Sequence, residues 1–198
     1  MPNEVLASLQ DVIRRAAENR VTGPAAAIEQ RFRDSTDVIA VLCDCSGSMT
    51  DVVGSRLSKF EHLQIVLADL EKGYPKMRIV AFGSIAKQVQ DAKHLPNPHK
   101  GMAFGGGTNL AAALDLAGKW RPRKTIVVSD GLPDSEEEAL EAAALMTGAI
   151  DTIYCGPDDH PAVEFLSSLS RKTGGTGVIW NGPREIRSMI RALLPAPE

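Results

Sequence analysis

Residues 37–50 read DVIAVLCDCSGSMT, an apolar run followed at once by an acid and by two serines at alternate positions. A run of Val, Ile and Leu without polar alternation is typical of a parallel strand that is buried on both faces. Residues 38–44 are therefore predicted to form a central strand. Asp44 then stands at the carboxyl end of this strand, and Ser46 and Ser48 lie in the turn that follows.

Similar apolar runs alternate with segments of helical periodicity along the rest of the chain. The predicted strands are 77–83, 124–130, 149–156 and 176–180, with a short edge strand at 86–89; the predicted helices are 58–72, 109–119, 136–147, 161–172 and 184–194. This βαβ rhythm predicts an α/β fold with a doubly wound, mostly parallel, Rossmann-like central sheet flanked by helices. Ser135 and Glu138 predict a capping box at the start of the 136–147 helix.

The length of 198 residues fits one such domain, predicted over 37–194, with a tail at 195–198. Residues 1–36 are predicted to form an N-terminal helical arm. Within the arm, apolar residues over 4–18 approach helical spacing, and a second short helix is expected to begin at Pro24.

Composition narrows the classes of partner and the compartment. The net charge is −3 and the Lys and Arg residues are scattered, which argues against nucleic acid as a partner. The N-terminus lacks a signal pattern and no apolar stretch is long enough to span a bilayer, so a cytoplasmic protein without a membrane partner is expected. Cys43 and Cys45 lie two apart on one face of a strand, where a disulfide would be strained, so reduced and buried thiols are predicted.

Three separated pieces of sequence place oxygen-bearing side chains where the sheet is expected to present them. Asp44 and Asp130 each end a predicted strand, and Thr108 follows three glycines at the start of a predicted helix. The carboxyl ends of parallel strands meet at one edge of the sheet, and this edge is where ligands bind. Two carboxylates and the hydroxyl groups of Ser46, Ser48 and Thr108 suit Mg²⁺, which prefers oxygen ligands. Gly47 and glycines 105–107 are expected to give the turn and the loop the freedom that such a site needs.

The segments DCSGS (44–48), GGTNL (106–110) and SDG (129–131) resemble the motifs of von Willebrand factor A domains, which include the integrin I domains. The resemblance covers about residues 37–194. It implies a metal-ion-dependent adhesion site that holds Mg²⁺ or Mn²⁺. Ser46 and Ser48 would bind the metal directly, Thr108 directly or through water, and Asp44 and Asp130 mostly through water.

The resemblance also implies a binding module rather than an enzyme. In this family the metal takes a carboxylate from an Asp or Glu of a partner protein, and intracellular members often work with AAA+ ATPases, including those of the MoxR type. Two alternatives stay open at this stage. One is a metal-dependent phosphohydrolase that uses Asp44, although haloacid dehalogenase-type phosphatases need a second Asp where Ser46 stands. The other is a structural domain whose site has lost its function.

Overall fold

The structure, a computed structural model, describes residues 35–52, 56–98, 104, 106–180 and 185–194. The predicted N-terminal arm lies outside these residues except for Ser35 and Thr36, and the predicted tail lies outside them entirely. The strands are β1 (Thr36–Asp44), β2 (Met77–Phe82), β3 (Ala86–Val89), β4 (Pro122–Ser129), β5 (Ala149–Tyr154) and β6 (Gly177–Ile179). The α-helices are α3 (Lys59–Leu70), α4 (Leu110–Gly118), α5 (Glu136–Leu145), α6 (Ala162–Thr173) and α7 (Ile186–Leu193).

The strands form one sheet in the order β3-β2-β1-β4-β5-β6. All neighbouring strands are parallel except the edge pair β2 and β3, which is antiparallel. The α/β fold with a mostly parallel sheet is therefore confirmed. The order reverses direction between β1 and β4, and the crevice at such a reversal is where open α/β sheets bind ligands.

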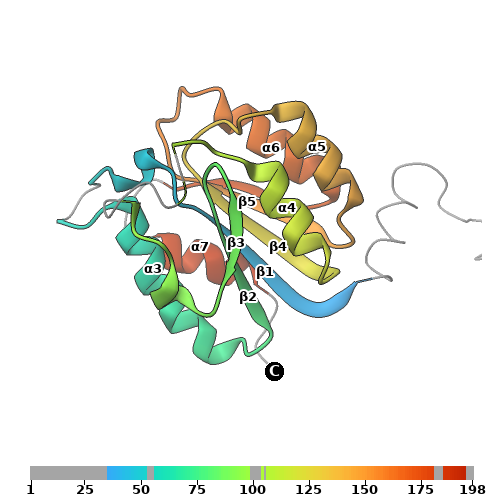
Figure 1. The fold of residues 1–198 in the computed structure, drawn as a ribbon, viewed down its shortest axis with the longest axis horizontal. Coiled ribbons are helices and arrows are strands. Elements are labelled where there is room, and N and C mark those ends of the chain that lie inside the picture. The colour runs from blue at the N-terminus through green and yellow to red at the C-terminus, as the bar shows by residue number, and fades with distance from the viewer. Residues whose placement is uncertain (1–34, 53–55, 99–103, 105, 181–184, 195–198) are drawn as a thin grey trace, which may run out of the picture.

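Helices cover both faces of the sheet (Figure 1): α3 and α7 lie on one face, and α4, α5 and α6 on the other. The side chains of β1 alternate between the two cores. Val41 and Cys43 pack toward α3 and α7, whereas Ala40 and Leu42 pack toward α4, α5 and α6, and all four are fully buried. Burial on both faces explains why this strand is a continuous apolar run without polar alternation.

The start of α3 is fixed by a complete capping box. The Ser58 hydroxyl accepts a hydrogen bond from the Glu61 amide, and the Glu61 carboxylate accepts one from the Ser58 amide at 2.8 Å. At the predicted box of α5, the Ser135 hydroxyl accepts from the Glu138 amide at 3.2 Å, which is the first half of the motif. The capping box at α3 matters for the site because it fixes the start of the helix and therefore the position of Lys59, the first helical residue.

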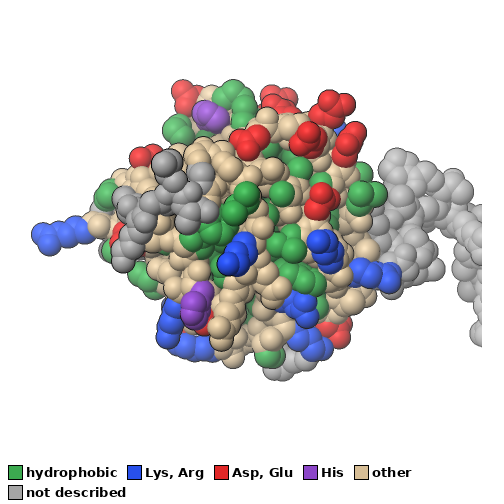
Figure 2. Space-filling view, in the orientation of Figure 1, with side chains coloured by type: hydrophobic (Ala, Val, Ile, Leu, Met, Phe, Trp, Pro, Cys, Tyr) green, Lys and Arg blue, Asp and Glu red, His purple; other side chains and the backbone are tan. Residues whose placement is uncertain are grey.

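Charged side chains are unevenly distributed over the face of the molecule seen in Figure 2. Figure 2 shows acidic side chains gathered over α5, whose first turn carries Glu136, Glu137 and Glu138. Among the described residues, no helix combines the length and the apolar character needed to cross a bilayer.

Candidate metal centre

Asp44 is the last residue of β1, and its carboxyl group is fully buried, with each oxygen atom accepting a hydrogen bond. Its Oδ1 accepts a hydrogen bond from the Ser46 amide at 2.8 Å, and its Oδ2 accepts one from the Ser129 hydroxyl at 2.6 Å. Burial raises the pKa of Asp44 to about 6, although the hydrogen bonds from Ser129 and Ser46 favour the ionised form and oppose this shift. The carboxyl group is thus held between the end of β1 and the end of β4.

Ser46, Ser48 and Asp130 form a continuous hydrogen-bonded chain beside Asp44. The two serine hydroxyl oxygens lie 3.1 Å apart, and the Ser48 hydroxyl donates to Asp130 Oδ1 at 2.6 Å. After Ser46 the chain forms a short 3₁₀ helix, η1 (Gly47–Thr50), whose Met49 is buried in the core. Asp130 directly follows β4, so the carboxyl ends of β1 and β4 lie side by side, as the sequence predicted.

Gly47 plays a smaller part than the sequence suggested. Its φ is not positive, and a Cβ atom at this position would meet nothing within 4 Å. The turn therefore does not depend on glycine there, because the 3₁₀ conformation is open to other residues.

Thr108 is placed at the same edge of the sheet through its backbone. Its amide donates to Asp134 Oδ1 at 2.8 Å, and its carbonyl accepts from the Asp134 amide at 3.0 Å. A Cβ atom on Gly107 would lie 2.7 Å from Asp134 Oδ2 and 2.8 Å from Ser84 Oγ, so a larger residue here would push aside the Asp134 carboxylate that holds the Thr108 amide. Within the described residues, the Thr108 hydroxyl makes no hydrogen bond to the other four predicted ligands. Gly105 lies outside those residues.

Lys59 is a site residue that sequence reasoning missed. Its ammonium group donates to Asp130 Oδ2 at 2.7 Å, and its side chain is only 7% exposed. Burial lowers the pKa of Lys59, but the hydrogen bonds and negative charges of Asp130 and Asp51 outweigh this and raise it. The Ser-x-x-Glu pattern at 58–61 predicts that Lys59 is the first residue of a helix, but it does not predict that the side chain is buried beside Asp130.

The donor set fits a hard divalent cation. Two carboxylates and three hydroxyl groups supply only oxygen, which is what Mg²⁺ and Mn²⁺ prefer. Among the described residues, no three His, Cys, Asp or Glu side chains gather in a way that would hold a metal. A cation here would therefore depend on the hydroxyl groups of Ser46, Ser48 and Thr108, as the resemblance implies.

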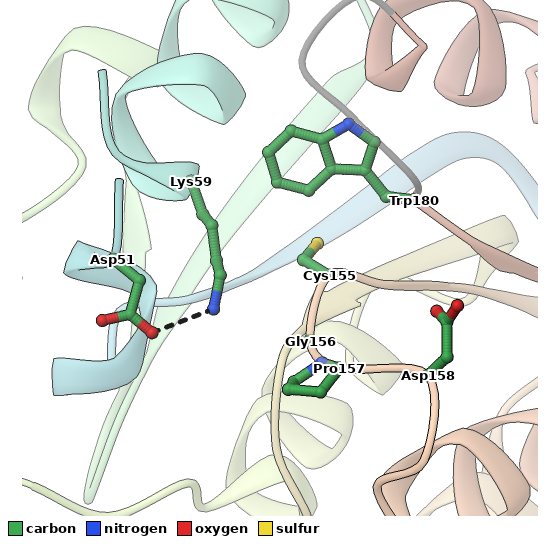
Figure 3. A pocket seen from close by; sticks show the side chains of 7 residues that line it. All are labelled: Asp51, Lys59, Cys155, Gly156, Pro157, Asp158 and Trp180. Carbon is green, nitrogen blue, oxygen red and sulfur yellow. Dashed lines mark hydrogen bonds and ion pairs between the residues drawn. The ribbon is translucent and has the colours of Figure 1, made fainter. Parts of the chain in front are cut away.

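A pocket of about 600 Å³ opens beside this cluster. Its wall is formed by Asp51, Lys59, Cys155, Gly156, Pro157, Asp158 and Trp180 (Figure 3). In Figure 3 the Lys59 side chain extends along one wall toward Asp51, while Trp180 and Cys155 form an apolar part of the lining. The pocket thus places apolar surface and both signs of charge next to Asp130.

The fold is that of von Willebrand factor A domains. One similar solved structure is a von Willebrand factor type A protein from Catenulispora acidiphila, with a TM-score of 0.59 and 18% identity, covering 80% of this chain and 42% of that one. A second is the manganese-loaded TRAP protein of Plasmodium vivax, with a TM-score of 0.57 and 17% identity, covering 81% of this chain and 74% of that one. A third is the ArnB paralog VWA2 of Sulfolobus acidocaldarius, with a TM-score of 0.54 and 18% identity, covering 78% and 44%.

These identities are low, so the likeness concerns the fold. The chain spans less than half of the length of two of the three structures. No protein-family model matches the sequence, and no curated protein is significantly similar to it.

Proposed function

We propose that this protein is a binding module that holds Mg²⁺ or Mn²⁺ with Asp44, Ser46, Ser48, Thr108 and Asp130 and uses the metal to engage an Asp or Glu of a partner protein. The observation that carries the proposal is the hydrogen-bonded chain of Ser46, Ser48 and Asp130 next to Asp44 at the switch point of the sheet. Hydroxyl ligands add no negative charge, so the cation keeps a strong attraction for an incoming carboxylate. The manganese in one similar structure agrees with this choice of metal.

The geometry favours this proposal over a phosphohydrolase that attacks with Asp44. A nucleophilic carboxylate must present an oxygen atom to its substrate. Asp44 is fully buried, and each of its oxygens already accepts a hydrogen bond. Asp44 is therefore suited to orient Ser46 and to contribute charge, whereas the exposed Ser48 faces the solvent from which a ligand would arrive.

Metal binding is tested first, by titrating the full chain with Mn²⁺ and following free Mn²⁺ by electron paramagnetic resonance. The double variant Ser46→Ala/Ser48→Ala should lose the binding, whereas Ser188→Ala, an exposed serine on α7, should keep it. Binding should also raise the melting temperature of the wild type, because the metal binds only the native state. A wild type that binds no Mn²⁺, or a double variant that binds it equally well, would contradict the proposal.

Engagement of a partner is tested by affinity capture in Mg²⁺ and in chelator, using the wild type and the same double variant as bait. A partner should be retained only by the wild type in Mg²⁺, and its capture should then fail when one Asp or Glu of that partner is replaced. A MoxR-type AAA+ ATPase, which the family resemblance implies, is the first candidate to search for among the captured proteins. Turnover of a phosphomonoester in Mg²⁺ that Asp44→Ala abolishes would instead support the hydrolase.

A further inference from the structure

The side chain of Lys59 brings a fixed positive charge into the candidate site. Its Nζ contacts Asp130 Oδ2 at 2.7 Å, while Asp130 Oδ1 accepts from the Ser48 hydroxyl at 2.6 Å. One carboxylate is thus shared between an internal cation and a hydroxyl group that is proposed to bind the metal. The protein already supplies, from its own chain, part of the positive charge that a metal ion would supply.

The pair with Asp130 is the strongest of the contacts that Lys59 makes. The Asp130 side chain is 1% exposed, so little water screens the two charges. The contact with Asp51 Oδ2 is longer, at 3.3 Å, and Asp51 is 69% exposed. The Ser48 carbonyl lies 3.4 Å from the ammonium group and adds a weaker bond. Lys59 is consequently held at the site by a buried partner and two partners nearer to the solvent.

We propose that Lys59 is a built-in counter-cation that weakens the binding of a divalent metal ion at this site, an inference that rests on the function proposed above. Asp130 attracts a metal less strongly because its charge is already matched, and the ammonium group repels the doubly charged ion. An opposite charge in contact with a carboxylate commonly changes the attraction of that carboxylate for a positive ion by about tenfold or more, which sets the expected scale of the effect on metal affinity.

The same charge favours an acidic ligand once the metal is bound. The metal-loaded site carries one more positive charge with Lys59 than it would without Lys59. An incoming carboxylate is therefore attracted more strongly. The carboxylate in turn offsets the repulsion between metal and ammonium group. Metal and acidic ligand therefore bind cooperatively, and each must strengthen the other by the same factor.

The test compares the Mn²⁺ affinities of charge variants at one pH and at low salt. Lys59→Gln removes the charge but keeps a hydrogen-bond donor for Asp130, whereas Lys59→Arg keeps the charge. Lys124→Gln is the matched control, because Lys124 pairs with the buried Asp151 at 2.6 Å near the opposite end of β4. Lys59→Gln should bind Mn²⁺ at least about tenfold more tightly than the wild type. Lys59→Arg and Lys124→Gln should stay within about twofold of the wild type, because neither changes the charge at the site.

An unchanged or weaker Mn²⁺ affinity of Lys59→Gln would overturn the inference, since Lys59 would then serve to orient Asp130. Lys59→Met supplies the same comparison should the glutamine variant fail to fold, as judged by its melting curve without metal. The Ser46→Ala/Ser48→Ala variant separates the two proposals. Loss of Mn²⁺ binding in this variant, together with an unchanged affinity in Lys59→Gln, overturns the role of Lys59 alone. Mn²⁺ binding that survives the serine substitutions overturns the proposed function, and the role of Lys59 with it.

Discussion

The hydrogen bond from Ser129 to Asp44 should stabilise the fold more at high pH than at low pH. Replacing Ser129 by Ala removes a donor that lies 2.6 Å from a carboxylate oxygen in a fully buried position. A hydrogen bond to a charged group contributes about 1.5–3 kcal/mol, and one between neutral groups about 0.5–1.5 kcal/mol. The loss on substitution therefore depends on whether Asp44 is ionised in the folded protein.

The raised pKa of Asp44 sets the sign of this dependence. The folded value is about 6 against an ordinary 3.8, so in the folded protein Asp44 is ionised at pH 8 and protonated at pH 4.5. A raised carboxyl pKa favours folding below pH 4, and this contribution is lost as the pH rises through 6. The shift of about two pKa units lowers the free energy of unfolding at pH 8, where Asp44 is ionised, by about 3 kcal/mol relative to acidic pH. The hydrogen bond from Ser129 keeps this loss from being larger. Ser129→Ala should thus destabilise the metal-free protein by about 1 kcal/mol more at pH 8 than at pH 4.5.

Urea unfolding in chelator at the two pH values measures this difference. Thr125→Val is the matched control on the same strand, because the buried Thr125 hydroxyl has no hydrogen-bond partner among the described residues. It should cause no loss of stability and no dependence on pH. Equal losses for Ser129→Ala at both pH values would refute the idea that the bond acts on an ionised Asp44.

Three other predictions concern the proton coupling, the loop and the helix cap. Mn²⁺ affinity should fall as the pH drops below 6, because protonation of Asp44 removes a negative charge from the site, and Asp44→Asn should flatten that dependence in a calorimetric titration. Gly107→Ala should cost about 1–3 kcal/mol through overpacking against Asp134 and Ser84, and the resulting displacement of the loop should weaken Mn²⁺ binding about tenfold. Gly106→Ala should leave Mn²⁺ binding unchanged, because a Cβ atom at Gly106 would meet nothing within 4 Å. Ser58→Ala should lower the free energy of unfolding by about 1 kcal/mol, and urea denaturation should show a smaller loss for Ser135→Ala, whose cap is the simpler one.

Much of the fold was predictable because hydrophobic periodicity decides where buried strands and covering helices lie. The strand at 86–89 and the helices at 109–119 and 161–172 were placed within one residue of their observed bounds. The end of α3 was less accurate, since residues 71–73 form a 3₁₀ turn that the same apolar pattern cannot distinguish from an α-helix. The strand order follows from pairing between distant segments, and the local pattern does not contain it.

The candidate site was predictable in part. Asp44 and Asp130 could be placed because each follows an apolar run, and the carboxyl ends of parallel strands meet at one edge. The Ser129 bond could not be foreseen, since it depends on the register that sets Cys43 beside Val128. Lys59 was missed because a lysine at the start of a helix is normally exposed, and only the packing of α3 against the end of η1 buries it.

Three buried cysteines make the opening of this fold measurable by chemical labelling. Cys43, Cys45 and Cys155 are free and buried, and burial raises the pKa of each, so none presents a reactive thiolate in the folded protein. Alkylation of Cys43, in the central strand, requires the sheet to open. Cys155 stands at the wall of the pocket and needs a smaller opening. The labelling rates of the two cysteines can be compared in one sample by mass spectrometry. The rate at Cys155 would report how often the pocket wall opens, and the rate at Cys43 how often the sheet opens, without an added probe.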